Sequence, residues 1–259
     1  MLLGGLALAV ALGPCRLIGS MALLPRRHLM WASAAMALFQ WSFFGAVAKA
    51  GATTATLVST AAAPLAAGAI AAARRRCWPR GGWWSALGVA SSGVSLVAAH
   101  GPNSAAAGVA LAVLGGFLYA IFTVETAYLE SASAGIRNGG LVSMAAALLF
   151  SALALLPVAG AHLGALLSRR GVMLTAYLGL VTTAVAYTLY ALGLRNVTPT
   201  RTLALQLLQP LAGAALDLLL FRGRPDRLAA IGMVFLAASA WLLIAGSSRP
   251  CHSGQGVRA

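Results

Sequence analysis

Two stretches of 26 residues repeat one pattern at an offset of 146 positions: TATLVSTAAAPLAAGAIAAARRRCWP at 54–79 and TRTLALQLLQPLAGAALDLLLFRGRP at 200–225. Both begin with Thr-x-Thr-Leu, carry Pro-Leu-Ala near the middle, and end with an arginine three positions before a proline. The biased composition explains matching alanines and leucines, but it does not explain prolines and threonines in register. The chain therefore contains an internal repeat of one helical unit.

Long apolar runs surround both copies of the repeat. The chain has 259 residues, of which 60% are hydrophobic and 8% charged, whereas soluble domains carry roughly a quarter charged residues. A bilayer core needs about 20 apolar residues per helix. The pattern predicts an all-α integral membrane protein of about nine transmembrane helices, over the runs 1–24, 29–49, 52–73, 83–100, 105–128, 139–160, 172–194, 199–221 and 228–246.

The two copies of the repeat fall five helices apart, in the third and the eighth run. An odd number of helices per copy turns the second copy upside down, which gives two inverted-topology repeats. We predict a first repeat at 1–104 with four helices, a second at 105–246 with five, and a disordered C-terminal tail at 247–259. A first helix of an original ten is then missing. Pro14 and Arg16 interrupt the first run, which a cleaved signal peptide also fits.

Positive charge is concentrated between the runs. The net charge of the chain is +14, and its arginines lie at the ends of the predicted helices. The positive-inside rule and contacts with lipid headgroups explain arginines in these places, so a nucleic-acid partner is not expected. One side of the predicted topology carries ten cationic residues and the other six, which predicts a cytoplasmic C-terminus. Abundant Ala, Gly and Arg are typical of a GC-rich bacterial genome, so we expect a multi-pass protein of the bacterial inner membrane.

The two copies resemble EamA-type members of the drug/metabolite transporter superfamily. The likeness lies in a helix, a short turn and a helix with a central proline, which reads AYTLYALGLR at 186–195, TPT at 198–200 and LLQPLAG at 207–213. The resemblance implies the ten-helix fold of the family, here lacking its first helix, with an alternating cavity between the repeats. The family often has glutamates where this chain has Gln209 and Arg224, so proton coupling through those two positions is in doubt.

Polar and aromatic stripes at helical spacing give the candidate substrate-binding residues. Small and hydroxyl residues on one face of a membrane helix are also common where helices pack together, so packing is the alternative interpretation of these stripes. For Glu125 the alternative is an interfacial carboxylate whose side chain extends to the headgroups. We expect Pro64 and Pro210 to be kinks that shape the cavity. The expected lining is Gln40, Trp41, Thr60, Tyr119, Glu125, Thr183, Tyr187, Gln206 and Gln209.

These features predict a secondary transporter that exports a small metabolite or drug by alternating access, with its site between the repeats. An enzyme is not expected, because the sequence has no HExxH or DDxxD motif and its four histidines are scattered. No metal or cofactor is expected either, since the three cysteines form no CxxC pair. The alternative is a truncated, non-transporting membrane partner protein. The expected partners are the lipid bilayer and a small-molecule substrate.

Overall fold

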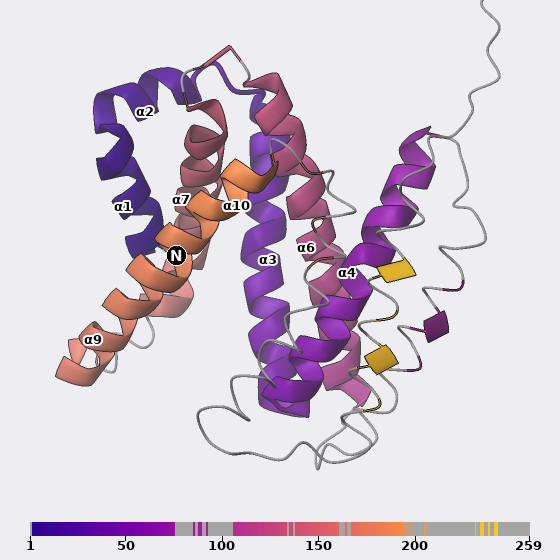
Figure 1. Ribbon diagram of the computed structural model, residues 1–259. Coiled ribbons are helices and arrows are strands. Elements are labelled where there is room, and N and C mark those ends of the chain that lie inside the picture. Colours follow the sequence, from indigo (N-terminus) through magenta and orange to yellow (C-terminus); the bar gives the residue numbers. More distant parts are fainter. Residues whose placement is uncertain are drawn as a thin grey trace, which may run out of the picture.

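The computed structural model describes residues 2–75, 106–133, 138–160 and 167–194, together with scattered single positions elsewhere. Within these ranges all regular structure is helical, as the sequence predicts. Figure 1 shows the helices as a bundle in which α3 (Arg26–Ala50) occupies the middle.

The N-terminal run is two short helices, where the sequence predicted a single span over 1–24. Helix α1 covers Leu2–Leu12 and α2 covers Pro14–Met21. Gly13 separates them with a φ of 83°, a left-handed conformation that a residue with a side chain rarely adopts. Pro14 then starts α2, because its missing N–H is no loss in the first turn of a helix.

The next two helices form a hairpin, α3 followed by α4 (Ala52–Arg75). Gly51 makes the turn with a φ of 82°, and its N–H donates to the carbonyl oxygen of Val47 at 3.0 Å. This glycine C-cap satisfies a carbonyl at the end of α3. Pro64 lies inside α4 and is fully buried. The predicted runs 29–49 and 52–73 are confirmed as helices.

A second pair follows, α6 (Ala106–Ala132) and α7 (Gly139–Gly160). Asn138 precedes α7 with a φ of 60°, and its carbonyl accepts the N–H of Val142 at 3.0 Å. Asparagine tolerates this left-handed conformation better than most residues. Helix α7 has the bounds predicted from sequence, and α6 ends four residues later than predicted.

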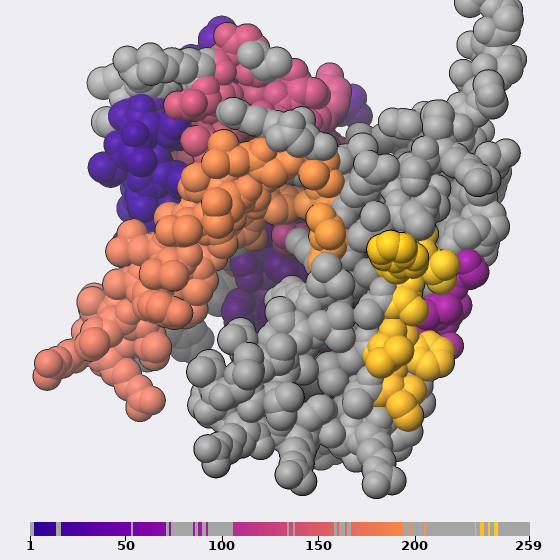
Figure 2. All heavy atoms as spheres, in the orientation of Figure 1, coloured from indigo at the N-terminus to yellow at the C-terminus, as the bar shows by residue number. Residues whose placement is uncertain are grey.

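The described chain then forms a rod of three joined segments, α9 (Arg169–Tyr177), η1 (Leu178–Val185) and α10 (Ala186–Leu194). The Ser168 hydroxyl caps α9 by accepting the N–H of Gly171 at 3.0 Å. Segment η1 is a π-helix, in which the Thr183 hydroxyl donates to the carbonyl of Leu178 five residues earlier, at 2.8 Å. Figures 1 and 2 show the rod running obliquely along the outside of the bundle.

Four of the described helical segments are long and apolar enough to cross a membrane: Arg26–Ala50, Ala106–Ala132, Gly139–Pro157 and Arg169–Gly193. Of the runs expected at 83–100, 199–221 and 228–246 the structure describes only scattered single positions, and the tail at 247–259 lies outside the described residues. The total of nine helices and the inverted repeat therefore stay predictions.

Close helix packing places α3 and α4 against α6. Helices α3 and α6 are antiparallel, because Gly108 meets Ala50 at one end while Glu125 meets His28 at the other. At Gly116 of α6 an added Cβ would lie 2.5 Å from the Ser59 carbonyl oxygen, so only glycine allows this approach to α4.

Candidate functional site

A cavity of about 240 Å³ lies where α3, α4, α6 and α10 meet, and we call it the central cavity. Helix α4 contributes hydroxyl groups to it, and the other three helices contribute aromatic rings. Its described lining is Phe39, Phe43, Thr56, Ser59, Thr60, Ala63, Tyr119 and Tyr187. None of these side chains carries a charge, so the described wall is amphipathic and neutral.

The aromatic wall is a continuous cluster of rings. Phe39 and Tyr119 lie 5.0 Å apart between ring centroids, which joins α3 to α6. Phe122, fully buried, continues the cluster at 6.2 Å from Tyr187 in an edge-to-face arrangement. Such pairs stabilise a site by about 0.5–1.5 kcal/mol each beyond the area they bury. The rings therefore give this wall a fixed shape.

The tyrosine hydroxyls of α10 have unequal partners. Tyr190 donates to the Thr123 hydroxyl at 3.0 Å, and Thr123 donates in turn to the Tyr119 carbonyl at 2.9 Å. Tyr187 donates to the Met36 sulfur at 3.9 Å, and a thioether is a weak acceptor. Tyr187 also has a side-chain hydrogen bond with Tyr119. Of the two tyrosines of α10 it is Tyr187 that lines the cavity, so its hydroxyl is the better placed to bind a ligand there.

Of the residues expected from sequence, the structure brings Thr60, Tyr119 and Tyr187 together on the central cavity. Pro64 lies in α4 directly after Ala63 of the lining. Gln206, Gln209 and Pro210 lie outside the described residues.

Four expected residues lie elsewhere than on this cavity, and Gln40 and Trp41 are the first two. Neither belongs to the described lining. Trp41 is 62% exposed. The third, Thr183, packs against α1, where an added Cβ on Gly4 would lie 2.5 Å from its Cγ2 atom. The sequence analysis missed Phe39 and Phe43, whose signal is an aromatic pair one helical turn apart.

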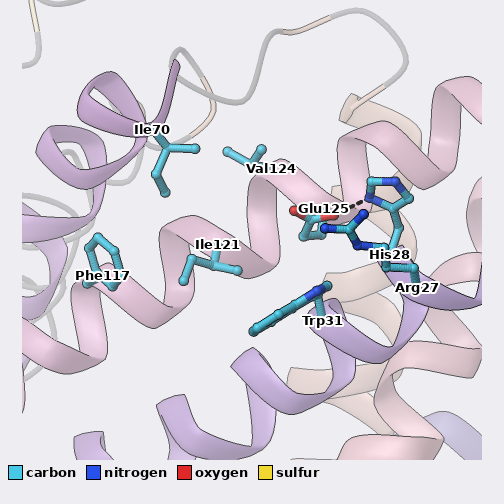
Figure 3. A pocket seen from close by; sticks show the side chains of 8 residues that line it. All are labelled: Arg27, His28, Trp31, Ile70, Phe117, Ile121, Val124 and Glu125. Atoms are coloured by element: carbon cyan, nitrogen blue, oxygen red, sulfur yellow. Dashed lines mark hydrogen bonds and ion pairs between the residues drawn. The ribbon is translucent and has the colours of Figure 1, made fainter. Parts of the chain in front are cut away.

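Glu125, the remaining expected residue, lines a second cavity of about 400 Å³, which we call the interfacial cavity (Figure 3). Its carboxylate is 5% exposed and lies 2.5 Å from the Nδ1 atom of His28. The His28 ring also stacks on Tyr128, with centroids 3.9 Å apart and planes 27° apart. A carboxylate inside a membrane protein needs such a partner. The other lining residues are Arg27, Trp31, Ile70, Phe117, Ile121 and Val124.

The described residues contain no cluster of three or more metal-ligating side chains. The neutral lining of the central cavity, with its rings and hydroxyl groups, is of the kind that binds small molecules.

The sequence pattern that defines the EamA-like transporter family matches residues 106–245, more than half of the chain. The chain belongs to this family. The resemblance to EamA-type transporters found in the repeated stretches is thereby confirmed. Family membership and the long apolar helices together show that the chain is a multi-pass membrane protein of a transporter family.

A curated relative supports the same assignment over a longer part of the chain. The protein is 29% identical over 216 residues to YwfM of Bacillus subtilis (strain 168), which is described as an uncharacterized transporter. The match covers 83% of this chain and 68% of the relative. Because it leaves out less than a fifth of the chain, it extends into the part before residue 106 that the family pattern does not match.

Proposed function

We propose that this protein exports a small molecule across the bacterial inner membrane by alternating access, with the substrate held in the central cavity. The main support for this proposal is that helices from both predicted repeats form the wall of the central cavity. Helices α3 and α4 belong to the predicted first repeat at 1–104, and α6 and α10 belong to the predicted second repeat at 105–246. In inverted-repeat transporters the substrate site lies at such a junction.

The lining favours a ligand with a flat or apolar body and a few hydrogen-bonding groups. Phe39, Phe43 and Tyr119 offer ring faces and edges, and Thr60 and Tyr187 offer hydroxyls. Binding sites for small molecules commonly combine an apolar wall with a few placed polar groups. We include Gln206 and Gln209 in the proposed site because their run follows α10 in sequence, and Pro64 and Pro210 as the kinks beside it.

A ligand screen on the purified protein tests the site. Amino acids, nucleosides and cationic drugs are each added, and the thermal unfolding midpoint is measured. A ligand at a hundred times its dissociation constant stabilises the folded state by about 2.7 kcal/mol. We expect the shift given by a true substrate to disappear in Tyr187→Ala.

The matched control is Tyr177→Ala, which removes a tyrosine of α9 that is 58% exposed and lines neither cavity. This variant is expected to keep the full shift. A ligand whose shift survives both Tyr187→Ala and Thr60→Val binds elsewhere, and that result would remove the central cavity as the substrate site.

Topology and direction need separate measurements. In a variant without Cys15, Cys77 and Cys251, single cysteines beside Arg75 and Arg224 are expected to react with an impermeant maleimide from opposite sides. Labelling from one side would contradict the inverted repeat. Export predicts that inside-out vesicles accumulate the ligand, while right-side-out vesicles do not.

A further inference from the structure

The interfacial cavity has a polar end and an apolar floor. Figure 3 shows Arg27, His28 and Glu125 grouped on one side, with Phe117 and Ile121 extending away from them along α6. Ile70 of α4 closes the apolar side and Trp31 of α3 borders it. Its volume of about 400 Å³ exceeds that of the central cavity.

The polar end carries the full positive charge of Arg27 beside a carboxylate that already has a partner. Glu125 is paired with His28 at 2.5 Å, and the His28 ring stacks on Tyr128. The ion pairs of the described residues do not include Arg27, so its charge is not matched by a carboxylate there. An anion is the ligand that complements this end.

Other charged and titratable groups near this end come from three helices. Arg26 adjoins Arg27 on α3, while Tyr128 and Glu130 follow Glu125 on α6. Helix α4 has arginines at its last two positions, Arg74 and Arg75. Of these groups, Arg26 is exposed and lies beside Arg27 in the first turn of α3.

The position of the cavity along the helices matches that of a lipid headgroup. Arg27 lies in the first turn of the span Arg26–Ala50, where arginine reaches the headgroup level. Trp31, one turn further in, is 56% exposed, as in an interfacial aromatic belt. Because α6 is antiparallel to α3, Val124, Ile121 and Phe117 lead from this interface toward the hydrocarbon over about 10 Å.

We propose that the interfacial cavity holds an anionic phospholipid, with its phosphate at Arg27 and one acyl chain along Ile121 and Phe117. Basic pockets between membrane helices bind anionic headgroups in this way. The apolar floor separates this ligand from free phosphate, which has no acyl chain to bury there. The site uses residues apart from the lining of the central cavity, so it does not depend on the proposed substrate site.

Native mass spectrometry of the full chain tests the proposal by titrating phosphatidylglycerol and phosphatidylcholine of equal acyl length. We expect tighter binding of phosphatidylglycerol and a loss of about tenfold in its affinity in Arg27→Gln, because a charge-assisted contact to the phosphate is removed. The matched control is Arg170→Gln, an exposed arginine in the first turn of α9 that lines neither cavity. It is expected to keep the wild-type affinity.

A second variant keeps the test decisive if Arg27→Gln folds poorly. Ile121→Trp fills the apolar floor, retains Arg27, and is expected to weaken phosphatidylglycerol binding as well. Equal affinity for the two lipids, or unchanged phosphatidylglycerol affinity in both variants, would overturn the proposal. Competition by millimolar inorganic phosphate that removes all bound phosphatidylglycerol would assign the site to a free anion instead.

Discussion

The central and the interfacial cavities are built from the same three helices and differ in chemistry. Both use α3, α4 and α6, yet the central cavity has hydroxyls and rings and the interfacial cavity has a charged pair and an arginine. On α6 the charged residue of the interfacial cavity, Glu125, lies six residues beyond Tyr119 of the central cavity, or about 9 Å along the axis. Depth in the membrane explains the contrast, since charge is tolerated near the headgroups and costly further in.

The largest loss of stability is expected when the charged pair of the interfacial cavity is broken. His28→Leu removes the side chain that pairs with Glu125 at 2.5 Å, and breaking such a buried pair costs about 3 kcal/mol of unfolding free energy. The double variant His28→Leu/Glu125→Leu is expected to recover most of that loss. Denaturant unfolding in micelles measures both variants. If the double variant is no more stable than His28→Leu, the pair is not what joins α3 to α6 at this end.

The next effect concerns the wall of the central cavity. Gly116→Ala places a Cβ 2.5 Å from the Ser59 carbonyl oxygen, so α4 and α6 must separate, at about 2 kcal/mol. We expect a lower thermal midpoint and weaker ligand binding. Gly45→Ala is the control, because its added Cβ meets a flexible Leu111 side chain at 3.3 Å. Similar losses of stability in both variants would contradict the idea that the close approach of α4 and α6 requires glycine at position 116.

A smaller effect separates the two tyrosines of α10. Tyr187→Phe removes a hydroxyl that faces the cavity and donates to the Met36 sulfur at 3.9 Å, so stability is expected to change less than in Tyr190→Phe, while substrate affinity falls about fivefold. Tyr190→Phe removes the bond to Thr123, so stability falls by about 1 kcal/mol and affinity is retained. Ligand titration and thermal unfolding of both variants check this. The reverse pattern would place Tyr190, and not Tyr187, at the ligand.

The smallest effect is expected at Trp41, which the sequence analysis placed in the site and the structure leaves 62% exposed. Trp41→Ala is expected to change the free energy of unfolding by less than about 0.5 kcal/mol and to leave ligand affinity unchanged. Thermal shift with the ligand from the screen checks both values. A clear loss of affinity would show that Trp41 reaches the substrate in another conformation of the transporter.

The sequence predicts the helices well because membrane insertion depends on apolar length, which is a local property. The described parts of the runs at 29–49, 52–73 and 139–160 are helical close to their predicted ends. The first run was different, because Gly13 and Pro14 together allow a break that hydropathy does not register.

The candidate site was harder to predict, because it depends on which face of each helix turns inward. Polar spacing placed Thr60, Tyr119 and Tyr187 on the cavity. The same preference for polar residues passed over Phe39, whose ring lines the cavity. His28 was also missed as a partner of Glu125, since the two are 97 residues apart and only the α3–α6 packing brings them together.

The π-helix at Leu178–Val185 lies in the rod that carries Tyr187. A π turn holds about one residue more than an α turn, so deleting one residue there would let the rod continue as an α-helix. Because the wide turn loses only its surplus residue, the positions beyond it would keep roughly the same direction, and Tyr187 would stay at the cavity. The same deletion in a regular α-helix such as α9 would rotate the residues on one side of it by about 100° relative to the other. The π-helix is therefore the part of the rod where the chain can lose a residue without re-aiming the side chains beyond it.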